Sequence, residues 1–159
     1  MTSSSGSGTN EIVEKFKGLS RGSQVIVAAA VVLFIDGFLH WYSVSASFGG
    51  FTVSASANAW DAPGAIWSIF AILLALAMAG VIVARLFLAA GTIPDNISGF
   101  SWGKINLGVA GVIALFIIIK LLNHSGDIAY GFFIGILCVI AICAGAFLNF
   151  QEEQKGTAA

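Results

Sequence analysis

Four long apolar stretches, separated by polar or glycine-rich breaks, constrain this chain more than any other feature of its sequence. The stretches cover about residues 23–42, 64–90, 102–122 and 128–150. A helix needs about 20 mostly apolar residues to cross a bilayer, and each stretch reaches that length. Since none alternates as a barrel strand does, each is expected to satisfy its backbone hydrogen bonds as an α-helix. The predicted fold is an all-α membrane protein, a four-transmembrane-helix bundle.

Composition supports lipid as the main solvent of this chain. Charged residues make up 9% of the 159 residues, whereas an average soluble domain has about 25%. With 58% hydrophobic residues, the chain lacks the charge to cover a water-facing surface. The net charge of −1 gives no field that attracts nucleic acid, so no nucleic-acid partner is expected. The expected partners are the lipid bilayer and other integral membrane proteins, or copies of the same chain.

The distribution of lysine and arginine predicts the orientation of the spans. If the N-terminus is cytoplasmic, one basic residue, Lys120, falls on the outer side. The other six fall on the cytoplasmic side: Lys15, Lys17, Arg21, Arg85, Lys104 and Lys155. Positive loops stay in the cytoplasm, so we predict a multi-pass plasma membrane protein with both termini cytoplasmic. An alternative is a signal peptide cleaved near Val44-Ser45-Ala46, although the long polar lead-in and Asp36 disfavour it.

The two ends of the chain are predicted to lie outside the 23–150 transmembrane domain. Residues 1–22 form a lead-in that is Ser/Gly/Thr-rich and disordered to residue 9, then a short helix from Asn10, ended by Gly18. Its basic residues suit a helix on the cytoplasmic surface, beside anionic lipid headgroups: Lys15, Lys17 and Arg21. The alternative is an ordinary topology-setting segment. Residues 151–159 form a polar cytoplasmic tail, expected to fray.

Residues 42–57, between the first two spans, have the pattern of a β-hairpin. Two runs that alternate apolar and Ser/Thr residues flank Gly49-Gly50, and a type I′ turn needs positive φ at both central positions. Pairing about this turn sets Phe48 opposite Phe51 and gathers the apolar residues on one face. We predict a small extracytoplasmic hairpin whose apolar face lies over the mouth of the bundle. Phe48, Gly49, Gly50 and Phe51 form its candidate partner-facing tip.

Two ionisable pairs fall near the outer ends of the first and third spans. Asp36 precedes His40 by four residues, and Lys120 precedes His124 by four, so each pair shares a helix face. Because intramembrane charges are expensive, these residues form a candidate polar cluster. Three interpretations are open: an Asp36–Lys120 ion pair that locks the two spans together, a proton- or ion-linked site, or a metal site of His40, His124 and a carboxylate.

Small residues at helical spacing predict close contacts between the spans. They are expected to face neighbouring helices of the same bundle, and a seam between copies of the chain is the alternative. The residues are Ala71, Ala75 and Ala79 in the second span, Gly108 and Gly111 in the third, and Gly131 and Gly135 in the fourth.

Sequence signatures of enzymes are missing from the chain. It contains no HExxH, no GxSxG, no phosphate-binding loop and no dinucleotide fingerprint. We therefore expect no enzyme activity, no catalytic residue, no cofactor and no dedicated metal ligand set. The first functional hypothesis is a non-enzymatic accessory or scaffold subunit that binds a larger membrane protein complex. The alternative is a small oligomeric transporter or channel with a polar site at Asp36, His40 and Lys120.

Two short motifs flank the predicted hairpin, Trp41-Tyr42-Ser43 and Asn58-Ala59-Trp60-Asp61. With these motifs, roughly residues 30–150 resemble uncharacterised small four-span membrane proteins of actinobacteria. The resemblance implies an actinobacterial type of plasma membrane protein and brings no activity and no functional residues. In outline the plan is also similar to claudin-type four-span proteins, but the claudin loop pattern of Trp, Gly-Leu-Trp and paired cysteines is absent here.

Overall fold

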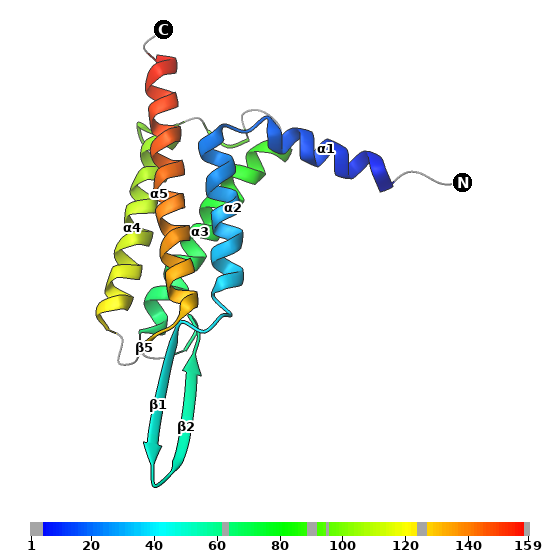
Figure 1. Cartoon of the computed structure of the whole chain (residues 1–159). Coiled ribbons are helices and arrows are strands. Elements are labelled where there is room, and N and C mark those ends of the chain that lie inside the picture. Colours follow the sequence, from blue (N-terminus) through cyan, green and yellow to red (C-terminus); the bar gives the residue numbers. More distant parts are fainter. Residues whose placement is uncertain (1–4, 62–63, 89–91, 95, 124–126, 158–159) are drawn as a thin grey trace.

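The computed structural model describes residues 5–61, 64–88, 92–94, 96–123 and 127–157 (Figure 1). In these ranges the helices are α1 (Ser5–Lys17), α2 (Arg21–Asp36), α3 (Ala65–Phe87), α4 (Trp102–Leu122) and α5 (Tyr130–Thr157). The strands are β1 (Tyr42–Phe48), β2 (Phe51–Ala57) and three two-residue strands, β3 (Asn96–Ile97), β4 (Phe100–Ser101) and β5 (Asp127–Ile128).

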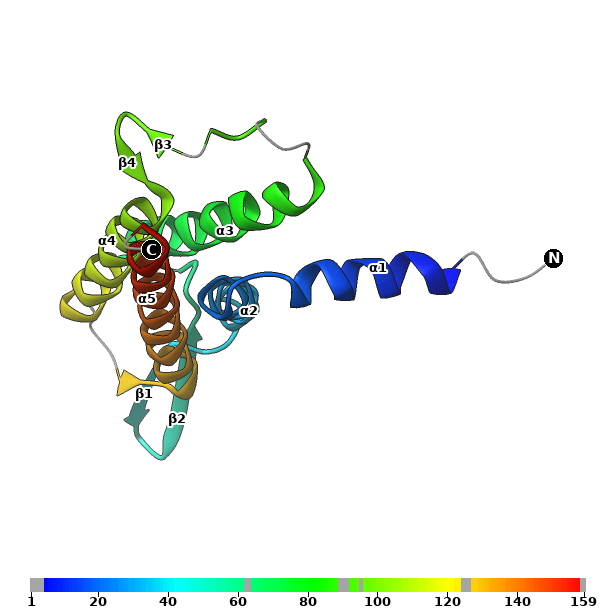
Figure 2. The ribbon, with the colours of Figure 1, turned by 90° about the horizontal axis from the view of Figure 1, so that it is seen from above.

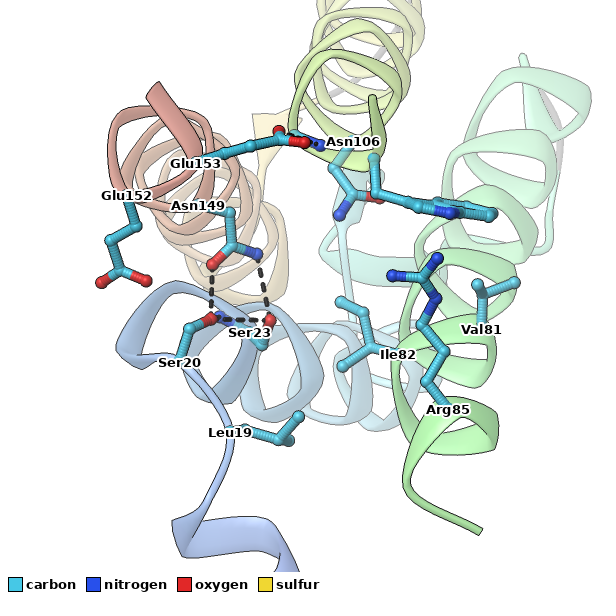
Figure 3. A pocket seen from close by; sticks show the side chains of 12 residues that line it. Leu19, Ser20, Ser23, Val81, Ile82, Arg85, Asn106, Asn149, Glu152 and Glu153 are labelled. Atoms are coloured by element: carbon cyan, nitrogen blue, oxygen red, sulfur yellow. Dashed lines mark hydrogen bonds between the residues drawn. The ribbon is translucent and has the colours of Figure 1, made fainter. Parts of the chain in front are cut away.

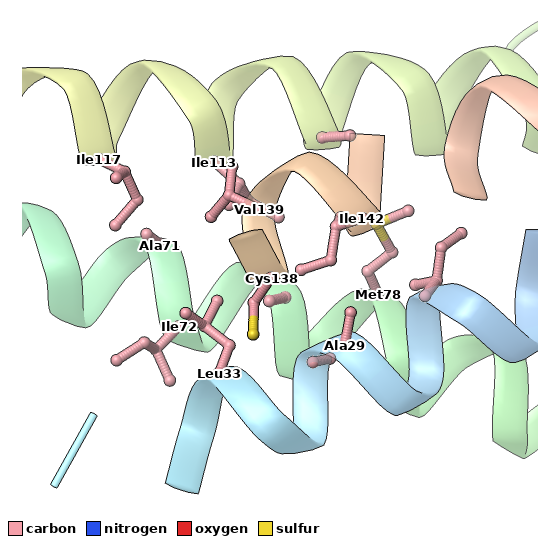
Figure 4. Close-up of a cluster of buried hydrophobic side chains, with 14 of the residues drawn as sticks. Ala29, Leu33, Ala71, Ile72, Met78, Ile113, Ile117, Cys138, Val139 and Ile142 are labelled. Atoms are coloured by element: carbon pink, nitrogen blue, oxygen red, sulfur yellow. The ribbon is translucent and has the colours of Figure 1, made fainter. Parts of the chain in front are cut away.

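Helices α2 to α5 pack side by side around one apolar core. Each contacts two others, in the cyclic order α2, α3, α4 and α5, and Figure 4 shows side chains of all four meeting in the centre. Leu33, Ile72, Ile113 and Ile142 are fully buried there, one from each helix. The outer faces of the helices are also apolar, a pattern typical of helices that span a membrane.

Within the described part of the chain, three helices (α3, α4 and α5) are long and apolar enough to cross a membrane. The predicted bounds of the third span agree with α4, and those of the second lie close to α3. The helix in the first predicted span, residues 23–42, ends earlier than predicted. Helix α2 ends at Asp36, and the chain turns at Gly37 before β1 begins at Tyr42. Helix α2 reaches the length needed to cross a membrane only together with α1, and the two helices are bent by 120° relative to each other.

Two helices extend beyond their predicted ends. Helix α1 begins at Ser5, so the prediction of disorder through residue 9 is wrong for residues 5–9. Once residues 10–17 are helical, adding further residues needs no new nucleus. Helix α5 continues through the predicted frayed tail to Thr157, since Gln, Glu and Lys are strong helix formers. As Figure 2 shows, α1 runs outward from the bundle beside the end of α2.

The hairpin has the predicted register and an unexpected direction. Phe48 pairs with Phe51, and Gly49 and Gly50 both have positive φ (58° and 85°), as predicted. The apolar face does not cover the bundle mouth: the hairpin extends away from the helices (Figure 1), which contradicts that prediction. The reason is at its base, where β5 adds a third strand by pairing Tyr42 with Ile128 and directs β1 outward.

The small residues divide into two groups. Ala71, Ala75 and Ala79 are buried inside the bundle, as predicted. Gly131 and Gly135 also lie at an intramolecular contact, against the segment that joins α2 to β1. The prediction is wrong for Gly108 and Gly111, because a Cβ at either position would meet no described atom within 4 Å.

Candidate functional site

Lys120 is completely buried near the end of α4, on the hairpin side of the bundle. Its ammonium donates hydrogen bonds to the backbone carbonyls of Ala59 (3.4 Å) and Asp61 (3.3 Å). It also lies 5.4 Å from the ring centroid of Tyr42 and 5.9 Å from that of Trp41. Carbonyl oxygens and aromatic faces both stabilise a cation. Lys120 therefore joins α4 to the segments at the base of the hairpin.

Asp36 is buried in a different setting at the end of α2. Its side chain is 1% exposed, and neither carboxyl oxygen has a hydrogen-bond partner within the described residues. Gly135 makes room for it, since a Cβ there would lie 3.0 Å from Oδ2 of Asp36. Its backbone carbonyl accepts hydrogen bonds from Nε1 of Trp41 (3.0 Å) and from the backbone N–H of Leu39 (2.9 Å).

The predicted Asp36–Lys120 ion pair is wrong. Within the described residues, no carboxylate oxygen of Asp36 lies within 4.0 Å of the Lys120 ammonium. Trp41 is a neighbour of both residues, with its Nε1 on the Asp36 carbonyl and its ring beneath the Lys120 ammonium. The indole thus contacts the backbone of Asp36 through Nε1 and the Lys120 ammonium through its ring. The predicted helix bounds put Asp36 and Lys120 at similar depth in the bundle. They did not predict that the Trp41 ring would lie next to both residues.

His40 does not join Asp36 and Lys120 in a cluster. His40 is exposed and makes an edge-to-face contact with Tyr130, with ring centroids 6.3 Å apart. His124 lies outside the described residues. In the part of the chain that the structure describes, no group of three or more His, Cys, Asp or Glu side chains is placed to hold a metal ion.

The base of the hairpin is fastened to the bundle by backbone hydrogen bonds. Trp41 donates to Ala57 (2.9 Å) and accepts from Ala129 (2.8 Å), while the His40 carbonyl accepts from Gly131 (3.0 Å). Trp41 and Tyr42 are buried and pack their rings against Phe132. Burial raises the pKa of Tyr42 to about 12. These contacts fix the direction in which the strands leave the bundle.

Beyond this base the hairpin is exposed on both faces. Its apolar face includes the tip residues Phe48 and Phe51, which are 90% and 79% exposed, and Val53, which is 71% exposed. On the polar face Ser47 and Thr52 share a hydrogen bond of 3.1 Å. Among the described strands, β2 pairs with β1 alone, so its other edge is open. The predicted tip is thus an accessible apolar surface on a fixed base.

Helix α1 lies at the opposite end of the bundle from the hairpin. Lys15 forms an ion pair with Glu11 (2.9 Å), and this hydrogen bond lowers the pKa of the Glu11 carboxyl. The Lys15 ammonium also lies 5.2 Å from the ring centroid of Phe87, at the end of α3. Ile12 and Val13 are exposed. Basic and apolar residues on one outlying helix suit a membrane surface. Contact of Lys15, Lys17 and Arg21 with lipid headgroups therefore stays a prediction.

The same end contains a polar cavity that the sequence did not predict (Figure 3). It has a volume of about 340 Å³ and is lined by residues of all four bundle helices and the α1–α2 junction. Asn149 joins α5 to α2, because its Oδ1 accepts from Ser20 (2.6 Å) and its Nδ2 donates to Ser23 (3.1 Å). The available signal was an asparagine within each of the last two apolar stretches, Asn106 and Asn149.

Two further contacts shape this cavity. The Arg85 guanidinium lies 4.4 Å from the ring centroid of Trp102 and donates to the Pro94 carbonyl at 3.0 Å. The Glu153 carboxylate accepts from the backbone N–H of Gly103 at 2.9 Å, which places a carboxylate from α5 at the start of α4.

Comparison with protein-family models, with curated proteins and with solved structures finds no match for this chain.

Proposed function

We propose that this chain is a non-enzymatic integral membrane accessory or scaffold protein. Its hairpin would bind an apolar surface on the extracytoplasmic side of a larger membrane protein complex. The observation that carries the proposal is the apolar face of a hairpin that is rigidly based and almost fully exposed. Exposed apolar patches on an otherwise ordered element are typical of protein interaction sites.

The membrane placement that this function needs has α2, α3, α4 and α5 all crossing the plasma membrane, with both termini cytoplasmic. The charge distribution supports the orientation, since one basic residue, Lys120, falls at the hairpin end. Helix α2 has 16 residues and is about 24 Å long, which is less than the roughly 30 Å of a hydrocarbon core. The turn from Gly37 to Trp41 and local thinning of the bilayer would cover the remainder.

The hairpin offers a partner two kinds of contact. Phe48 and Phe51 would supply the apolar anchors, because large aromatic side chains dominate binding energy at interfaces. The open edge of β2 would supply backbone donors and acceptors to an added strand. A partner with an apolar extended segment satisfies both, and we propose a second membrane protein that presents such a segment.

The alternative, a small oligomeric transporter or channel with a polar site at Asp36, His40 and Lys120, has less support. That function needs these side chains to share a wet path. Lys120 and Asp36 are 0% and 1% exposed, in separate settings, whereas His40 is exposed. Nothing in this arrangement favours transport over an accessory role.

The test is gentle extraction from native membranes, followed by quantitative mass spectrometry of the proteins that co-purify. The variant replaces Phe48 and Phe51 with serine. The matched control replaces the adjacent pair on the polar face, Ser47 and Thr52, with alanine. We expect a stoichiometric larger complex with the wild type and the control, and at least about a tenfold loss with the phenylalanine variant.

Two results would contradict the proposal. One is a wild-type protein that purifies only as a monomer or a homo-oligomer. The other is a phenylalanine variant that keeps its partner at the wild-type level. Thermal unfolding of both variants must match that of the wild type, because the substituted side chains lie outside the core.

A further inference from the structure

The cavity opposite the hairpin contains an unused polar group deep in its wall. The Asn106 side chain is 8% exposed and has no hydrogen bond to any other described residue. It lines the cavity from α4, between Asn149 and Arg85 (Figure 3). Buried amides are almost always hydrogen-bonded, so an open one that faces a cavity of about 340 Å³ indicates room for a polar ligand.

The charges around the cavity are of both signs and are separated. Arg85 and Glu152 lie on opposite sides of it (Figure 3). Arg85 has five N–H donors, and within the described residues one of them bonds to Pro94. The Glu152 carboxylate has no partner among the described residues. The charge of Glu153 already faces the start of α4, where it accepts from Gly103.

We propose that this cavity binds the phosphoethanolamine headgroup of a membrane phospholipid. The phosphate would lie against Arg85, and the primary ammonium against Glu152. Asn106 and Asn149 would bond to the atoms between these two poles. A guanidinium is well suited to phosphate, and an ammonium with three N–H donors suits a carboxylate and amide oxygens.

Other headgroups match this lining less well. A purely anionic headgroup would place its charge near both Glu152 and Glu153, which together outnumber Arg85. A choline group has no N–H donor for Glu152 and is usually held by open aromatic faces. The ring in this cavity, Trp102, already stacks with Arg85 at 4.4 Å. The lining therefore selects a primary ammonium.

The position of the cavity indicates a lipid rather than a soluble ligand. It lies at the ends of the apolar helices, where headgroups meet the bundle in the membrane placement proposed above. Leu19, Val81 and Ile82 form an apolar part of its wall, along which the start of an acyl chain can lie. The inference rests on that placement and is independent of the partner that the hairpin binds.

The test measures lipid retention by the delipidated full-length protein. The protein is mixed with equal amounts of phosphatidylethanolamine, phosphatidylcholine and phosphatidylglycerol with identical acyl chains, and bound lipid is counted by native mass spectrometry. We expect about tenfold preference for phosphatidylethanolamine. Arg85→Gln should lower that binding about tenfold, and Glu152→Gln should reduce it to the phosphatidylcholine level.

The controls remove one charge of each sign from exposed residues outside the cavity, Lys155→Gln and Glu14→Gln, and should retain lipid as the wild type does. Equal retention of the three lipids, or wild-type retention by both cavity variants, would overturn the proposal. Free phosphoethanolamine at the same concentration should not displace the lipid. If it does, the site belongs to a soluble ligand and the lipid assignment is wrong.

Discussion

Replacing Gly145 with alanine should push α5 away from α2, because the two helices touch backbone to backbone at this point. A Cβ on Gly145 would lie 2.7 Å from the carbonyl oxygen of Gly22 and 2.9 Å from Cγ1 of Ile26. Ordinary contacts of a Cβ begin at 3.4 Å, so the oxygen lies about 0.7 Å too close. A backbone oxygen cannot rotate away as a side chain can, so the helices themselves must separate.

The size of the effect follows from two opposing contributions. Overpacking a tight interior typically costs about 1–3 kcal/mol. Alanine also favours a helix over glycine by roughly 0.5–1 kcal/mol. Gly111 isolates the second contribution, since a Cβ there would meet no described atom within 4 Å. We expect Gly145→Ala to lower the free energy of unfolding by about 1–2 kcal/mol, and Gly111→Ala to raise it slightly.

The assay is thermal unfolding of both variants in the same detergent, followed by circular dichroism and tryptophan fluorescence. For a chain of this size the Gly145 variant should melt roughly 2–8 °C below the wild type. The Gly111 variant should melt at or above the wild-type temperature. Equal shifts of the two variants in one direction would refute the close approach of α2 and α5, because helix propensity alone predicts a gain at both positions.

Three further changes test other contacts. Lys120→Met should lower the free energy of unfolding by about 1–3 kcal/mol, because a charged group loses two hydrogen bonds. A higher melting temperature than the wild type in detergent would contradict the contacts to Ala59 and Asp61. The free energy of unfolding should stay constant below pH 10 and decrease between pH 10 and about 12, because the folded chain favours the neutral phenol of Tyr42. In Tyr42→Phe, melts over the same pH range should lack this decrease. Glu153→Ala should cost about 1 kcal/mol by removing the acceptor at the start of α4, and unchanged melting would show that the Gly103 N–H finds another partner.

Local patterns predicted the elements whose structure depends on neighbouring residues. The register of the hairpin follows from Gly49-Gly50 and the alternation on either side, because a slip by one residue would exchange its two faces. The bounds of α4 follow from a mostly apolar stretch between Ser101 and Asn123. Both features are determined within about twenty residues of sequence.

Features that depend on contacts distant in sequence were not predictable. The early end of α2 and the separation of Asp36 from Lys120 both depend on where the Trp41 ring packs. Its neighbours include Phe132 and Gly135 on α5, far along the chain. Helix spacing gives the depth of a residue in a bundle, but it does not say which side chain fills the space between two helices.

The cavity lined by Asn106 and Asn149 was missed for a different reason. Charged residues within apolar stretches, such as Asp36 and Lys120, indicate buried polar sites, and the uncharged amides of Asn106 and Asn149 carry the same information. Asn149 binds Ser20 and Ser23 from a helix at the other end of the chain. Only the fold shows that the amide of Asn106 lines the same cavity and has no hydrogen-bond partner among the described residues.

The exposed hairpin needs a physical reason for keeping its structure, since an isolated hairpin is marginal in water. The reason is its base: pairing begins at Tyr42 and Ala57, next to the buried Trp41, and β5 adds hydrogen bonds on the other side. Strands that start from such a fixed base lose less conformational entropy on pairing than free ones do. They also lose less on binding, so a partner gains affinity from a surface that is already ordered. The residues that hold the base, rather than those at the tip, therefore determine whether Phe48 and Phe51 can act as anchors.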